Sequence, residues 1–166
     1  PTDGSVLLGD TEMTTLSEKE LAALRLTRFG FVLQQAHLMA ALCLLDNIVL
    51  PGFLAGLRPR PEVTARGEEL MERMGIAELA TNGVTEVSGG QLQRAGICRA
   101  LINDPGIVFA DEPTGALNSA TALQILDLLG EIHASGTTLV MVTHDSQVAA
   151  RADRVLVLVD GQITED

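Results

Sequence analysis

The second half of the chain alternates short apolar runs with segments of helical periodicity. Residues 107–110 and 138–142 are apolar runs of strand length, and residues 155–159 form a third run that precedes a turn signal. The segments 88–103 and 119–134 have helical patterns. Strands that alternate with helices predict a parallel sheet with right-handed crossovers. Because the runs are apolar throughout, we expect both faces of this sheet to be covered.

The first 35 residues carry weaker signals. Residues 1–10 are rich in turn signals and predict a hairpin or an edge segment. Thr15 or Ser17 is positioned to cap a short helix that runs to Arg25. Residues 29–34 form a short apolar run that ends in polar residues, which predicts one more strand.

The middle of the chain is predominantly helical in pattern. Helical periodicity extends from about residue 46 to residue 80, and breaks are expected at its prolines, which are Pro51, Pro59 and Pro61. We therefore divide the chain into a strand-bearing core of residues 1–45 and 96–166 and a helical insert of residues 46–95.

Composition narrows the classes of function. The net charge is −11, so nucleic acid is not an expected partner, because phosphate binding needs a basic surface. The chain has no Trp and no Tyr, which leaves little for base stacking. Cys43 and Cys98 fit neither a metal site nor a disulfide framework, and we expect both to be reduced. The longest uninterrupted apolar run, residues 38–45, is too short to span a bilayer, so we expect a soluble, cytoplasmic protein.

Polar residues follow three of the predicted strands. Gln34 ends the first, Asp111 and Glu112 end the second, and His144 follows the third. In parallel sheets, ligands bind beyond the carboxyl ends of the strands, so these side chains converge if the strands are neighbours. Asp111 could then hold Mg²⁺, and Glu112 could deprotonate an attacking water. The alternative is a solvated strand end that is followed by an ordinary turn.

A second candidate site precedes a predicted helix. Ser88 is a suitable N-cap, and Gly89 and Gly90 let a ligand approach the backbone before Gln91. Unpaired N–H groups at a helix N-terminus bind phosphate well. The alternative is a capped helix without a ligand.

Five motifs occur in an order that resembles the ATP-binding subunits of ABC transporters. Residues 31–34 resemble the Q-loop, and residues 87–94 resemble the signature motif. Residues 107–113 resemble the Walker B strand with its glutamate, residues 115–118 the D-loop, and residues 143–145 the switch histidine. The sequence of residues 111–117 resembles that of the branch of the family that exports macrolides, lipoproteins or bacitracin-type peptides. The implied fold is α/β, with a P-loop NTPase-like parallel-sheet core and a helical ABC subdomain inserted in it.

The resemblance assigns roles within one subunit. It implies ATP and Mg²⁺ as ligands, with Asp111 supporting the ion and Glu112 acting as general base. Gln34 would touch the ion or the attacking water, and His144 would contact the γ-phosphate. The implied activity is ATP hydrolysis that drives a permease.

It also implies two protein partners. Ser88, Gly89, Gly90 and Gln91 would close over a γ-phosphate held by a second ABC subunit, and Asn118 stands where the D-loop usually has aspartate. A coupling helix of a transmembrane permease would dock in the groove between Gln34 and the helical insert. The chain would then lie at the inner face of the cell membrane.

One motif of the family is absent from this sequence. No Gly-x-x-x-x-Gly-Lys segment occurs, and the single lysine, Lys19, is followed by Glu20. The resemblance therefore implies a core that is N-terminally truncated, and we expect the chain alone to bind Mg-ATP weakly and to associate through exposed apolar surface. One alternative is a degenerate subunit that lends only its signature motif to a partner's site. Another is an ABC protein of DNA repair or translation, which the acidic charge disfavours.

Overall fold

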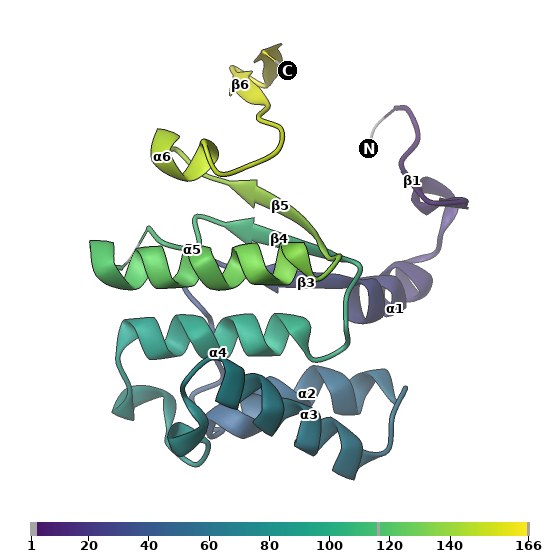
Figure 1. The fold of residues 1–166 in the computed structure, drawn as a ribbon. Helices are drawn as coiled ribbons and strands as arrows, with labels where there is room; N and C mark the ends of the chain where they lie inside the picture. The colour runs from purple at the N-terminus through teal and green to yellow at the C-terminus, as the bar shows by residue number, and fades with distance from the viewer. Residues whose placement is uncertain (1–2, 116, 166) are drawn as a thin grey trace.

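The computed structural model describes residues 3–115 and 117–165. Most of its helices are stacked in layers below a small sheet, whereas the short last helix and a C-terminal hairpin lie above it (Figure 1). The elements in chain order are β1 Leu7–Leu8, β2 Thr11–Glu12, η1 Met13–Thr15, α1 Glu18–Arg28, β3 Phe29–Val32, α2 Leu44–Ala55, α3 Arg60–Arg73, η2 Ala77–Leu79, η3 Val84–Glu86, α4 Gly89–Leu101, β4 Ile107–Asp111, α5 Ser119–Ala134, β5 Thr138–Val142, α6 Ser146–Ala149, β6 Val157–Val159 and β7 Gln162–Glu165.

The central sheet has the order β3-β4-β5, and both strand pairs are parallel. Helices α2, α3 and α4 connect β3 to β4, and α5 connects β4 to β5. The pairing places Phe31 opposite Phe109, and Asp111 opposite Val142. This arrangement confirms the predicted α/β class with a parallel sheet and helical crossovers.

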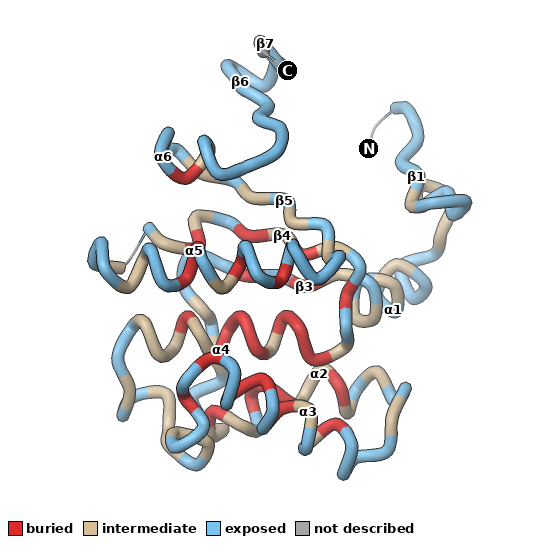
Figure 2. The backbone as a smooth tube through the Cα atoms, viewed as in Figure 1, coloured by how far each residue is buried: buried red, intermediate tan, exposed pale blue. Residues whose placement is uncertain are grey.

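Helices cover one face of this sheet. The covered face carries Val32, Val108 and Ala110, which join the main core together with residues of α4 and α5. Figure 2 shows the buried residues gathered along α4 and on the sides of its neighbours that face it. Helix α4 packs against β3 on one side and against α2 and α3 on the other. It therefore crosses the boundary proposed at residues 95 and 96, and the division into core and insert stays a prediction.

The other face, which we term the open face, is largely uncovered, so the prediction of two covered faces is wrong. Phe31 and Phe109 stack there with ring centroids 5.6 Å apart, and Phe29 meets Phe109 edge-on at 5.5 Å. Val140 and Val142 lie on the same face and are 43% and 61% exposed. Strands this apolar are normally covered on both faces, but none of the described helices packs on this one, so its side chains stay exposed.

The third apolar run forms a hairpin rather than a strand of the central sheet. Strand β6 pairs antiparallel with β7, and every residue of β6 is exposed. Asp160 and Gly161 connect the two strands, with φ values of 49° and 77°. Two consecutive left-handed residues suit a tight hairpin turn, so the turn prediction holds while the buried strand does not.

The prolines of the middle segment act differently from the prediction. Pro51 lies inside α2 without ending it, because Ile48, Val49 and Gly52 around it are held in the core. Pro59 caps α3, and Pro61 occupies its first turn, where a missing N–H costs no helical bond. Of the breaks expected at prolines, only the stretch between α2 and α3 is present, and a further break that no proline marks follows Arg73 at Gly75, whose φ is 64°.

The N-terminal predictions hold within the described residues. Strands β1 and β2 form a hairpin around Gly9 and Asp10. Ser17 caps α1 through a reciprocal capping box with Glu20, and the helix continues three residues past Arg25, to Arg28.

Two further sequence expectations can be compared with the structure. Both cysteines are free, and burial raises the pKa of Cys98 to about 12, so this thiol is protonated at neutral pH. Within residues 3–115 and 117–165, no helix is long and apolar enough to cross a membrane.

The open face generates a test. We predict that the isolated chain self-associates and that Val140→Lys shifts it toward the monomer, because a charge on the open face opposes apolar contact between copies. Light scattering coupled to size-exclusion chromatography measures the shift. Leu54→Lys is the control, since Leu54 is 68% exposed but lies on α2. Equal effects of the two substitutions would contradict a role for the open face.

Candidate active site

The parallel register brings four predicted site residues to one edge of the sheet. Gln34 lies two residues beyond β3, and Asp111 is the last residue of β4. Glu112 follows directly, and His144 lies two residues beyond β5. Since β3, β4 and β5 are neighbours, the predicted convergence of these strand ends is confirmed.

Glu112 and His144 are in direct contact. The Glu112 Oε1 atom lies 2.7 Å from Nδ1 of His144 and also accepts a hydrogen bond of 2.9 Å from the His144 backbone N–H. The Glu112 side chain is 19% exposed, whereas that of His144 is 85% exposed. The contact requires Nδ1 to carry a proton when Glu112 is ionised, and it leaves Nε2 to face a ligand.

The backbone of Glu112 has an unusual conformation. Its φ is +44°, in the left-handed region that a residue with a side chain seldom adopts. The Glu112 N–H donates to the carbonyl of Val142 over 2.9 Å, and its own carbonyl accepts from Gly115 over 3.1 Å. This turn separates two adjacent carboxylates: Asp111 is exposed and Glu112 is half-buried against His144. Strain of this kind is concentrated at functional sites.

Gln34 approaches the loop that follows Glu112. Its side-chain Nε2 lies 3.2 Å from the position that a Cβ atom on Gly115 would take. A side chain at Gly115 would therefore push Gln34 away. The contact joins the end of β3 to the Glu112 loop, although no hydrogen bond links Gln34 to Glu112 among the described residues.

A cavity of about 450 Å³ opens beside Glu112 and His144. Its walls come from the loop after β4, the first half of α5 and the region of α6, including Gly115, Asp145 and Arg151. The cavity places the carboxylate and the imidazole on one accessible surface. A molecule in it would meet a hydrogen-bond acceptor and a donor side by side.

The second predicted set forms a separate pocket of about 430 Å³. Ser88 caps α4: its Oγ accepts from the Gln91 N–H over 3.3 Å, while Gln91 Oε1 accepts from the Ser88 N–H over 2.8 Å. Gly89 and Gly90 line the pocket together with Asn118, which caps α5 by accepting from the Thr121 N–H over 3.0 Å. The structure thus joins the signature segment to the D-loop segment. Ala116, within that D-loop segment, lies outside the described residues.

The residues present do not form a metal cage of their own. Across the described part of the chain, no three His, Cys, Asp or Glu side chains are grouped closely enough to hold an ion. Mg²⁺ commonly takes only one or two protein carboxylates and completes its shell with phosphate oxygens and water. Asp111, exposed at the end of β4, fits that kind of partial site.

Comparison with known proteins decides the family. A family model described as ABC transporter matches residues 1–115. The chain belongs to the ABC transporter family. Among ABC structures it is similar to MJ0796, a bacterial ABC transporter cassette in dimeric form, with a TM-score of 0.89 and 37% identity over 99% of this chain and 73% of that chain. A post-hydrolysis dimer of MJ0796 bound to ADP and phosphate gives a TM-score of 0.84 and 34% identity, with the same coverage.

Curated ABC proteins place the chain in the branch that its motifs indicate. It is 43% identical to a macrolide export ATP-binding/permease protein MacB of Rhodospirillum rubrum, over all of this chain and 25% of that protein. A probable export ATP-binding/permease protein MacB of Pseudomonas entomophila is 43% identical over 98% of this chain and 24% of its own length. The chain therefore spans about a quarter of the length of these ABC relatives.

Sequence reasoning missed several features of this ABC site. The left-handed backbone of Glu112 has no signal in the sequence, because glutamate does not favour that conformation. The sequence also gives no signal for the approach of Gln34 to Gly115. Arg94 was not singled out, yet it donates to the Met74 carbonyl over 2.6 Å and to Gln124 over 2.7 Å.

The two signature glycines differ in their surroundings, which makes a matched test. A Cβ on Gly90 would lie 2.7 Å from Thr121 Cγ2, whereas a Cβ on Gly89 would meet nothing within 4 Å. We predict that Gly90→Ala lowers the free energy of unfolding by about 1–3 kcal/mol. Gly89→Ala should be neutral or raise it by up to about 1 kcal/mol, since alanine favours helix.

Denaturant unfolding of the protein that contains this chain measures both effects. Thr121→Ser removes the methyl group and should restore most of the stability that Gly90→Ala loses. If Gly89→Ala and Gly90→Ala destabilise equally, the close packing of α4 on α5 is not what requires glycine at residue 90.

Proposed function

We propose that this chain is the ATP-hydrolysing module of an ABC exporter and that it drives a membrane permease. The observation that carries the proposal is the contact between Glu112 and His144 at the carboxyl end of a parallel sheet, beside Asp111 and Gln34. The similarity to macrolide export ATP-binding/permease proteins supports the exporter part. A retained carboxylate–imidazole pair also favours a catalytic module over one that only donates its signature motif.

The geometry suggests how Glu112 acts. Its Oε1 atom is engaged by His144 through two hydrogen bonds, which leaves Oε2 to accept a proton from an attacking water. The rigid backbone of the loop then fixes the direction of that carboxylate. His144, with Nδ1 held by Glu112, would present Nε2 toward a phosphate oxygen of the bound nucleotide.

Asp111 and Gln34 complete the proposed site. Asp111 would hold Mg²⁺, directly or through water, and Gln34 would contact the ion or the attacking water. The ion neutralises charge that develops on the phosphate oxygens when ATP is bound. Gln34, exposed at the end of β3 and next to Gly115, reaches the Glu112 loop from the side opposite β5.

A second subunit completes the proposed mechanism. The pocket lined by Ser88, Gly90 and Asn118 is distinct from the cavity beside Glu112, although Leu117 lines both. In a dimer, the pocket lined by Ser88 in one copy would close on the γ-phosphate that the other copy holds. The solved dimers of MJ0796 support this assembly.

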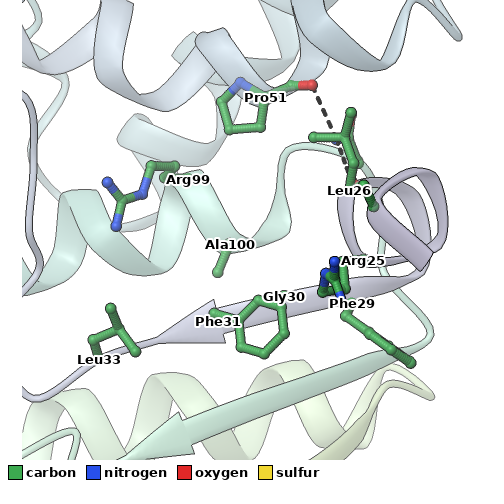
Figure 3. A pocket seen from close by; sticks show the side chains of 11 residues that line it. Arg25, Leu26, Phe29, Gly30, Phe31, Leu33, Pro51, Arg99 and Ala100 are labelled. Carbon is green, nitrogen blue, oxygen red and sulfur yellow. Dashed lines mark hydrogen bonds between the residues drawn. The ribbon is translucent and has the colours of Figure 1, made fainter. Parts of the chain in front are cut away.

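A pocket along the edge of β3 is the proposed permease contact. It has a volume of about 370 Å³ and lies next to the Q-loop, between α1, α2 and α4. Figure 3 shows Pro51 of α2 and Leu26 of α1 on different sides of the pocket, with Gly30 of β3 at its base. Its lining is mostly apolar and includes Arg25, which suits an apolar helix with an acidic residue. The chain would then act at the cytoplasmic face of the membrane.

Removing the proposed base tests the function. In the full-length protein, we expect Glu112→Gln to lower kcat for ATP hydrolysis at least ~100-fold, because the amide cannot accept the proton. Nucleotide binding should persist, as measured by fluorescence of a labelled ATP. Glu131→Gln on the exposed surface of α5 is the matched control. Full activity of Glu112→Gln would contradict the assigned role of this carboxylate.

The isolated chain should behave differently from the full protein. We expect the 166 residues alone to bind Mg-ATP weakly or not at all, because they contain no glycine-rich lysine loop to surround the β- and γ-phosphates. Isothermal titration of this chain and of the full-length protein makes the comparison. Tight, stoichiometric binding by the isolated chain would show that the described residues suffice.

A further inference from the structure

The loop that carries Gln34 is attached to the signature helix. Residues 33–37 run along α4, and three positions on one side of that helix touch them: Gln93, Gly96 and Arg99. These positions are spaced three residues apart, so they form a single stripe. The same helix begins at Ser88, in the other candidate pocket.

Arg99 makes two of the hydrogen bonds. Its Nη1 donates to the His37 carbonyl over 3.0 Å, and its Nη2 donates to the Ala36 carbonyl over 2.5 Å. His37 has a φ of +44°, a left-handed conformation that turns two successive carbonyls toward one guanidinium. Burial lowers the pKa of Arg99 from its ordinary value. A partly buried guanidinium needs hydrogen-bond acceptors to offset its desolvation. The same bonds hold the Ala36 and His37 carbonyls in place.

Gln93 makes the third bond directly beside Gln34. Its Nε2 donates to the Leu33 carbonyl over 3.0 Å, and the residue is 4% exposed. Between the two polar contacts, a Cβ on Gly96 would lie 3.1 Å from the Ala36 side chain, so the loop passes close to the helix. Figure 3 shows Arg99 and Leu33 at the same end of the pocket beside β3.

These contacts connect the two candidate pockets through one rigid element. Gln34 is bracketed by Leu33, held by Gln93, and by Ala36 and His37, held by Arg99. Its own side chain then reaches Gly115 in the Glu112 loop. The position of the Gln34 side chain beside this loop therefore depends on the bonds that Gln93 and Arg99 make.

We propose that Gln93 and Arg99 are positioning residues: they hold the backbone on both sides of Gln34 and so keep its side chain beside the Glu112 loop. The inference rests on the proposed function, because it takes Gln34 and Glu112 to act on ATP. Neither residue touches nucleotide. Each acts through the backbone of residues 33–37.

The test uses the full-length protein and compares Arg99 of α4 with Arg58, which lies between α2 and α3. Arg99→Met removes the donors to the Q-loop. Arg58→Met is the control, because Arg58 also donates to a carbonyl, that of Ile102 over 3.2 Å, and pairs with Asp104, but lies away from residues 33–37. We expect Arg99→Met to lower kcat about tenfold or more, with KM for ATP nearly unchanged, since small displacements of positioned groups cost rate rather than binding. Arg99→Lys should recover part of kcat, because lysine can reach one carbonyl.

Hydrogen exchange provides a second readout that a general loss of stability does not reproduce. Amides of residues 33–37 should exchange faster in Arg99→Met than in Arg58→Met when the two variants have equal melting temperatures. If Arg99→Met does not fold, Gln93→Met, which keeps the size of the buried side chain, takes its place with the same expectations.

The outcomes separate this inference from the proposed function. An unchanged kcat in Arg99→Met, or an equal loss in Arg58→Met at equal stability, would overturn the positioning role while Glu112→Gln still abolishes hydrolysis. If Glu112→Gln retains full hydrolysis, the proposed function fails first, and the exchange experiment alone decides whether α4 holds the Q-loop.

Discussion

The parallel pairing of β3, β4 and β5 is the constraint on which the candidate site depends. The register sets Asp111 opposite Val142, and the next backbone hydrogen bond, from the Glu112 N–H to the Val142 carbonyl, extends the ladder by one residue. That last bond fixes Glu112 beside the chain that leaves β5, and His144 is two residues further on. A slip of one residue would move Asp111 to the covered face and would break the pairing with His144. The relative positions of the site residues are therefore set by the register of the sheet.

The one-sided sheet explains why two adjacent carboxylates differ. Asp111 follows the alternation of β4 and lies on the open face, in line with Phe109. Glu112 leaves that alternation through its left-handed backbone and turns toward His144. Asp111 thus lies on the exposed apolar face, whereas Glu112 is partly buried. Whatever covers the open face would approach Asp111, whereas the cavity beside α5 is lined by Glu112 and His144 and not by Asp111.

The sequence predicted the parts of this fold that follow from local chemistry. Helix α5 and strand β5 begin and end where predicted, because Asn118 caps the helix and Gly136, with φ of 104°, ends the turn after it. The convergence of Gln34, Asp111, Glu112 and His144 was predicted on the condition that the strands are neighbours, and the sheet order meets that condition. The errors arose where an apolar pattern has two structural meanings. Residues 155–159 have the composition of a buried strand but form an exposed hairpin, and Pro51 is tolerated because tertiary packing outweighs its local cost. The contacts that orient Glu112 and Gln34 depend on distant backbone positions, for which a single sequence has no signal.

Helix α4 shows how polar side chains organise a mostly buried element. Gln93, Arg94 and Arg99 each donate to a backbone carbonyl on a different segment: Leu33 after β3, Met74 at the end of α3, and the Ala36–His37 turn. Carbonyl oxygens at loops lack partners of their own, so each donor satisfies a group that would otherwise be unpaired near the core. Because the acceptors are backbone atoms, the contacts depend on the path of each loop rather than on its side chains. Arg94 adds a bond to Gln124 of α5, which brings the D-loop helix into the same arrangement. The helix that begins at the signature segment is thereby bonded to the Q-loop, to α3 and to α5, and a force applied to any one of them acts on the others through it.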